Sequence, residues 1–116
     1  MRFLSTTLHG VADYLVGLIV IALPLLYGWV GWPLWSMVGL GVFVIVYSLL
    51  TDYELSAVRV LSMPVHLTLD ALFAVLLLAA PVLLDFPAGE RWPNYVIGVL
   101  SLVIVAITRV PRPASI

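Results

Sequence analysis

The sequence has no cysteine, which excludes disulfides, cysteine-ligated zinc, iron–sulfur clusters and thiol redox chemistry. It also has little charge. Only 9% of its 116 residues are charged and the net charge is −1, whereas about a quarter of the residues in a soluble domain are charged. Because the chain contains no basic cluster, it supports neither nucleic-acid binding nor a polybasic patch for lipid headgroups.

Apolar residues make up most of what is present: 64% of the chain is hydrophobic and the mean hydropathy is +1.21. They form four runs that are each long enough to cross a hydrocarbon core of about 30 Å, which takes roughly 20 helical residues. We therefore predict an all-α membrane protein, a single four-helix transmembrane domain over residues 1–116 surrounded by the lipid bilayer. The predicted helices span about residues 8–29, 33–50, 64–84 and 93–110.

The arginines predict how these helices are oriented, because positive charge is retained on the cytoplasmic side of a membrane. The N-terminus, the second loop and the C-terminus share one face, which we expect to be cytoplasmic. It carries Arg2, Arg59, Arg109 and Arg112, against Arg91 alone on the other face. The opposite, external face then holds all the tryptophans, which are expected to anchor at the membrane interface: Trp29, Trp32, Trp35 and Trp92.

An internal repeat appears when the sequence is aligned with itself at an offset of 57 positions. Polar and aromatic identities, which are rare in so apolar a chain, recur at this one offset. We therefore predict a tandem duplication of a two-helix unit, with repeat 1 at about residues 1–57 and repeat 2 at about 58–116. The two parallel repeats are expected to be related by a pseudo-two-fold axis along the membrane normal. The matched pairs include Arg2/Arg59, Ser5/Ser62, His9/His66, Asp13/Asp70, Trp35/Trp92 and Thr51/Thr108.

Each repeat places a histidine and an aspartate four residues apart on one face of its first helix. A small residue and a proline follow on the same face. Ionisable groups are costly toward lipid and small residues let backbones approach closely, so we predict that the first and third helices pack through these faces. The faces consist of His9, Asp13, Gly17, Val20 and Pro24, and of His66, Asp70, Ala74, Leu77 and Pro81.

Three interpretations of His9, Asp13, His66 and Asp70 stay open. They form a structural polar core, in which each histidine bonds an aspartate four residues along its own helix or across the axis, as His9 with Asp70 and His66 with Asp13. Alternatively, they form a proton or cation path, because histidine titrates near neutrality and carboxylates carry protons in membranes. In the third, His9 and His66 ligate a haem, a chlorophyll-type pigment or a metal, with each aspartate orienting its imidazole.

Three segments resemble those of small bacterial SPW-repeat membrane proteins: residues 9–15 (HGVADYL), 47–54 (YSLLTDYE) and 63–70 (MPVHLTLD). Those proteins are similar in carrying duplicated two-helix units, each with a Ser-Pro-Trp-like element toward the end of its first helix. The corresponding triplets here are Leu23-Pro24-Leu25 and Ala80-Pro81-Val82. The resemblance implies a bacterial membrane protein and supplies no activity. We expect the chain to lie in the inner (cytoplasmic) membrane with both termini cytoplasmic.

The chain has no Ser-His-Asp order, H-E-x-x-H motif or phosphate-binding glycine loop, so we assign no catalytic residue and predict no enzyme. No cofactor is predicted as a first choice. The preferred function is that of a non-enzymatic membrane protein acting through helix–helix contacts, as a homo-oligomer or as an accessory subunit bound to other membrane protein subunits. The alternative is a conduit or cofactor-binding protein that uses the paired histidines and aspartates.

Overall fold

The computed structural model describes residues 2–110, which fold into four α-helices and one short 3₁₀ helix. Each α-helix belongs to a segment that is long and apolar enough to cross a bilayer, with mean hydropathies between 1.3 and 2.0. The predicted all-α fold with four helices of transmembrane length is confirmed, and it indicates a multi-pass membrane protein. The elements are α1 (Thr6–Tyr27), α2 (Gly31–Leu49), α3 (Met63–Leu83), η1 (Ala88–Glu90) and α4 (Trp92–Ile107).

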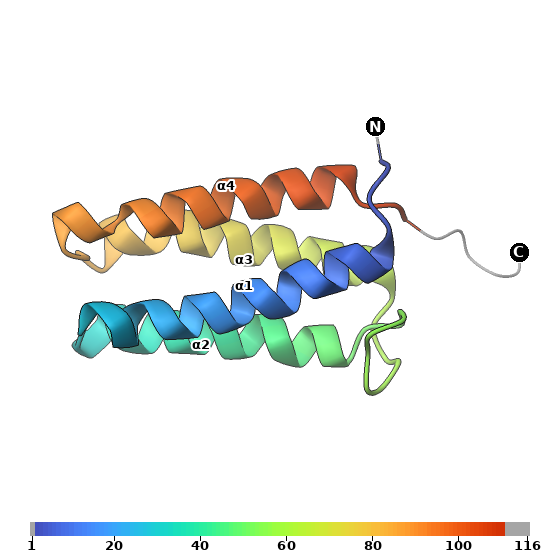
Figure 1. The fold of residues 1–116 in the computed structure, drawn as a ribbon, viewed down its shortest axis with the longest axis horizontal. Coiled ribbons are helices and arrows are strands. Elements are labelled where there is room, and N and C mark those ends of the chain that lie inside the picture. Colours follow the sequence, from blue (N-terminus) through green and yellow to red (C-terminus); the bar gives the residue numbers. More distant parts are fainter. Residues whose placement is uncertain (1, 111–116) are drawn as a thin grey trace, which may run out of the picture.

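The helices form two antiparallel hairpins, α1–α2 and α3–α4, that lie side by side (Figure 1). The start of α1, the α2–α3 loop and the last turn of α4 lie at one end of the bundle, which we call the His–Asp end. The α1–α2 and α3–α4 connections lie at the other, which we call the tryptophan end. Arg112 of the predicted cytoplasmic face lies outside the described residues.

Serine side chains begin α1 and α3 in the same way. Ser5 caps α1 by accepting a hydrogen bond from the backbone N–H of Leu8 at 3.2 Å, and Ser62 caps α3 by accepting one from Val65 at 3.4 Å. Such caps satisfy backbone donors that have no partner inside the helix. The cap at Ser5 starts α1 at Thr6, two residues before the predicted start.

The last helix ends at Ile107, three residues before the predicted end at 110. The backbone N–H of Leu4 donates to the Ile107 carbonyl at 2.8 Å, and the N–H of Arg109 donates to the Leu4 carbonyl at 2.8 Å. The segment after α4 is therefore extended, because it pairs with the segment before α1. Thr51 and Leu61, 57 positions from Thr108 and Leu4, form the matching bridge between the end of α2 and the start of α3.

Small residues lie where the helices of each hairpin approach most closely. A Cβ added to Gly41 of α2 would come within 2.7 Å of the Gly17 carbonyl oxygen in α1, and one added to Gly98 of α4 within 3.2 Å of the Ala74 carbonyl oxygen in α3. Small residues permit such backbone contacts in membranes. Gly17 and Ala74, which we predicted in the α1–α3 contact, thus serve contacts within the hairpins.

Between the hairpins, residues 57 positions apart touch each other at three levels. A residue in one half can touch its counterpart in the other half only if both lie near the axis that relates the halves. These contacts are therefore what a two-fold axis between the hairpins would produce. The duplication itself stays a prediction from the sequence. The pairs are His9 and His66, with ring centroids 5.3 Å apart, Met37 and Asn94, with Sδ and Nδ2 3.4 Å apart, and Trp29 and Phe86, with ring centroids 5.0 Å apart.

One tryptophan differs from the predicted interfacial anchors. Trp32, Trp35 and Trp92 are exposed at the tryptophan end, but Trp29 is only 6% exposed. Its ring packs on Phe86, and its indole N–H donates to the Glu90 carboxylate. Trp29 therefore joins the two hairpins at this end, and its burial corrects its predicted place at the lipid interface.

We expect Gly41→Ala to lower the free energy of unfolding by about 1–3 kcal/mol, because the added methyl group would overpack a backbone contact. Gly89→Ala is the control, since Gly89 lies in η1, is exposed and has no atom of the described residues within 4 Å of an added Cβ. That change should be neutral or slightly stabilising. Circular dichroism during SDS titration from mild detergent measures both. Equal losses would contradict the close approach.

Candidate functional site

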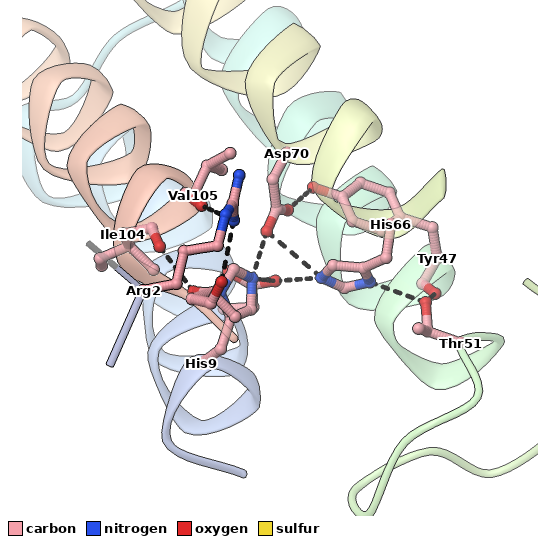
Figure 2. Close-up of polar contacts among 10 residues, drawn as sticks. Arg2, His9, Tyr47, Thr51, His66, Asp70, Ile104 and Val105 are labelled. Carbon is pink, nitrogen blue, oxygen red and sulfur yellow. Dashed lines mark hydrogen bonds and ion pairs between the residues drawn. The ribbon is translucent and has the colours of Figure 1, made fainter. Parts of the chain in front are cut away.

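The four residues singled out by the repeat lie together at the His–Asp end of the bundle. His9 and Asp13 come from the first turns of α1, and His66 and Asp70 come from the first turns of α3. Both histidines are 0% exposed, Asp70 is 3% exposed and Asp13 is 7% exposed. We call these four residues the His–Asp cluster (Figure 2).

The cluster is closed by contacts in both of the patterns that the sequence left open. Across the hairpins, His9 Nε2 lies 2.5 Å from Asp70 Oδ2 and His66 Nε2 lies 2.6 Å from Asp13 Oδ2. Along each helix, Nε2 of His9 lies 3.1 Å from Asp13 Oδ2, and that of His66 lies 3.2 Å from Asp70 Oδ2. Two nitrogens and two oxygens thus alternate around a ring, and the shortest contacts join the hairpins.

Two threonines hold the outer nitrogens of the imidazoles. His9 Nδ1 lies 2.6 Å from Thr108 Oγ1, and His66 Nδ1 lies 2.7 Å from Thr51 Oγ1. Each threonine donates its single hydroxyl proton to a backbone carbonyl one turn earlier, Thr51 to Tyr47 at 2.7 Å and Thr108 to Ile104 at 2.5 Å. The threonine oxygen must therefore accept from Nδ1–H. This assigns a proton to Nδ1 in both histidines and turns both Nε2 atoms toward the aspartates.

Each short contact across the hairpins then needs one shared proton. A nitrogen lone pair and a carboxylate are both acceptors, so a hydrogen bond between them requires a proton on one of the two atoms. A pair of imidazolium and carboxylate and a pair of imidazole and carboxylic acid both have zero net charge. The cluster is therefore neutral as a unit, which suits ionisable groups held within membrane-spanning helices.

Tyr47 makes the two halves of the cluster unequal. Its hydroxyl donates to Asp70 Oδ1, whereas the position 57 residues later is Ile104, which has no hydroxyl to offer Asp13. Sequence reasoning missed the role of Tyr47, although Tyr47 lies in the last turn of α2, four residues before Thr51, which follows the end of that helix. Thr51 and Thr108 were visible as a matched pair in the repeat, but their task was not.

The α2–α3 loop covers the cluster. The ring of Tyr53 packs against Gly10, where an added Cβ would overlap it, and its centroid lies 5.9 Å from that of His66. The loop is held to α1 by the Thr6 hydroxyl, which contacts the two Glu54 carboxylate oxygens at 2.6 and 2.9 Å. This hydrogen bond lowers the pKa of the Glu54 carboxyl below its usual value.

Arg2 closes the other side of the site (Figure 2). Its guanidinium donates to the carbonyls of Val105 and Thr108 at 2.9 and 2.8 Å. It thereby satisfies acceptors at the end of α4 that lack partners within the helix. Its partner in the repeat, Arg59, instead lies in the exposed α2–α3 loop, 3.5 Å from Asp52.

The space around the imidazoles does not fit a haem or a chlorophyll-type pigment. A macrocycle bound between His9 and His66 would occupy the positions of Asp13 and Asp70, which are buried in contact with both imidazoles. A single ion needs no such space. The described residues that could hold one are the four of the His–Asp cluster, whose ligand atoms lie within 4.8 Å of one another.

Comparison of the chain with models of protein families, with curated proteins and with solved structures found no match. The functional argument therefore depends on the geometry of the chain itself.

We expect Thr108→Val to lower the free energy of unfolding by about 1–3 kcal/mol, because it leaves the buried Nδ1–H of His9 without an acceptor. Thr68→Val is the matched control. Thr68 is exposed on α3, and its hydroxyl bonds only the Pro64 carbonyl of its own helix. SDS titration monitored by circular dichroism compares the two variants. A loss in Thr108→Val no larger than in Thr68→Val would argue against the assigned histidine tautomer.

Proposed function

We propose that this protein is a small non-enzymatic membrane protein that acts through helix–helix contacts, as a homo-oligomer or as an accessory subunit of a larger membrane complex. The observation that carries the proposal is an apolar groove of about 490 Å³ on the outer surface between α2 and α3. Its lining combines the small residues Ser36, Gly39, Ala79 and Ala80 with larger apolar ones that include Trp35, Phe43, Leu76 and Leu83.

Small residues on a lipid-facing surface are the feature that favours a second helix there. Without a hydrophobic force between helices in lipid, association depends on close packing, which small residues allow. Gly39 is exposed and has no atom within 4 Å of an added Cβ, so it serves no contact inside the bundle. At the corresponding place on α4, 57 positions later, the residue is Val96, which is 48% exposed.

The interior supports a contact function more than a conducting one. The His–Asp cluster lies at one end of the bundle, and deeper along α1 and α3 come the fully or nearly fully buried apolar side chains of Val20, Phe73 and Leu77. Beyond them, Asn94 Nδ2 donates to the Leu77 carbonyl at 3.0 Å. The polar groups are thus separated by packed apolar side chains, which offer no site to a proton or a cation.

We expect a Gly39→Cys variant to form an oxidative crosslink in native membranes, either to a second copy or to another membrane chain. The absence of native cysteine makes the added thiol unique. Electrophoresis without reductant separates the dimer from a heterologous adduct, which mass spectrometry identifies. Val96→Cys is the control at the corresponding position of α4 and should stay monomeric. If both variants stay monomeric, or both crosslink equally, the groove is not a contact surface.

We extend the proposal to the membrane that holds the protein and to the orientation of the bundle in it. The resemblance to SPW-repeat proteins supports a bacterial inner membrane. Within the described residues, Arg2, Arg59 and Arg109 lie at the His–Asp end and Arg91 lies at the tryptophan end. Because positive charge is retained in the cytoplasm, this distribution supports a cytoplasmic His–Asp end with cytoplasmic termini.

Two further cysteine variants test this orientation. Ala57 is exposed in the α2–α3 loop and Ala88 is exposed at the start of η1, at opposite ends of the bundle. A membrane-impermeant maleimide added to intact spheroplasts should label Ala88→Cys at once and Ala57→Cys only after lysis, as read by a gel shift. The reverse pattern would place the His–Asp end outside the cell.

A further inference from the structure

The four ligand atoms of the His–Asp cluster lie close enough together to hold a single metal ion. Around the ring, neighbouring nitrogens and oxygens lie 2.5, 3.2, 2.6 and 3.1 Å apart. Ligand atoms about 2.0–2.1 Å from a zinc ion at the corners of a tetrahedron lie about 3.3–3.4 Å from one another. The two contacts along each helix are close to this spacing, and the two across the hairpins would lengthen by about 0.8 Å from their hydrogen-bond distances when an ion replaced the shared protons. Two independent hydrogen-bonded pairs would need only two of these contacts. Here each imidazole lies within reach of both carboxylates, and the four ligand atoms all lie within 4.8 Å of one another.

The histidines are oriented as metal ligands are oriented. A metal-binding histidine donates its other N–H to a fixed acceptor, which sets the tautomer and aims the lone pair at the ion. Thr51 and Thr108 do this for His66 and His9, because each threonine oxygen accepts from Nδ1 and leaves Nε2 facing the centre. The Tyr47 hydroxyl binds Oδ1 of Asp70, which leaves Oδ2 of that carboxylate for the ion.

The charge and the chemistry of the donors define the class of ion. Two neutral imidazoles and two carboxylates carry a charge of −2, which a divalent cation balances. The ion would take the place of the two shared protons and leave the buried cluster neutral. Imidazole nitrogen favours zinc, copper and nickel, whereas calcium and magnesium prefer sites made only of oxygen.

From this geometry we propose that the His–Asp cluster binds one divalent transition-metal ion, with His9 Nε2, His66 Nε2 and one carboxylate oxygen each of Asp13 and Asp70 as ligands. The ligands come equally from α1 and α3, so the bound ion joins the two hairpins at their His–Asp end. This site is separate from the groove between α2 and α3, and the proposal does not depend on the contact function.

Zinc binding to the full chain tests the proposal. The protein is purified in mild detergent without a histidine tag, stripped with a chelator, and titrated with Zn²⁺ by calorimetry, with metal analysis after desalting. We expect one ion per chain and a rise of the thermal midpoint by about 5 °C or more with excess zinc, since the ion binds only the folded state. His9→Ala and His66→Ala should each abolish stoichiometric binding.

Conservative variants that keep all four ligands test the orientation of the imidazoles, and the zinc affinity is measured on variants whose helical circular dichroism matches that of the native protein. Thr51→Val and Thr108→Val retain all four ligands but lose the hydrogen bond that orients an imidazole, and they should weaken zinc binding about 10- to 100-fold. Asp52→Asn is the control for adventitious binding, because Asp52 is an exposed carboxylate in the α2–α3 loop at the same end of the bundle and makes no contact with the cluster among the described residues. It should bind zinc as the native protein does.

The spectrum of bound copper distinguishes histidines that are ligands of the ion from histidines that only stabilise the fold. Electron paramagnetic resonance of the Cu²⁺-loaded native protein should show coupling to two imidazole nitrogens, and each single histidine variant that folds should show one. The proposal is overturned by a copper signal without nitrogen coupling, by zinc binding that is unchanged in His9→Ala, His66→Ala and the threonine variants, or by a native chain that retains no ion.

Discussion

Two short contacts between a histidine of one hairpin and an aspartate of the other are the interaction on which the surrounding structure depends. Ionisable groups inside membrane-spanning helices are tolerated where they are paired and turned away from lipid. Because His9 bonds Asp70 and His66 bonds Asp13, α1 and α3 must face each other at this end. Thr51 and Thr108, which follow the ends of α2 and α4, then satisfy the outer nitrogens of the imidazoles.

The segments that flank the helices also join the two halves of the chain. Leu4, which precedes α1, pairs with the segment at the end of α4. Leu61, its counterpart 57 positions later, pairs with the segment at the end of α2. These bridges place Thr108 and Thr51 beside the imidazoles. At the tryptophan end, Trp29 from the first hairpin packs on Phe86 from the second. The two hairpins are therefore joined at both ends, although they are separate units along the chain.

The His–Asp cluster and the groove between α2 and α3 are separate sites with different roles. The imidazole nitrogens of the His–Asp cluster and the aspartate Oδ2 atoms that face them have partners within the chain and are buried, so they are not available to a partner in the bilayer. The outer surface has the separate groove at Gly39, where no atom of residues 2–110 lies within 4 Å of an added Cβ. An ion at the cluster would change how firmly the hairpins are joined. A second helix in the groove would contact one helix of each hairpin.

The sequence by itself determined the number of helices, because each needs about 20 apolar residues to cross a bilayer. It also singled out the four cluster residues, because rare polar identities recurred at one offset. Only the tertiary structure decided the role of Tyr47, the task of the two threonines and the burial of Trp29. The partners of these side chains lie on other helices, and a pattern along one helix does not specify which group across the bundle a hydroxyl or an indole meets.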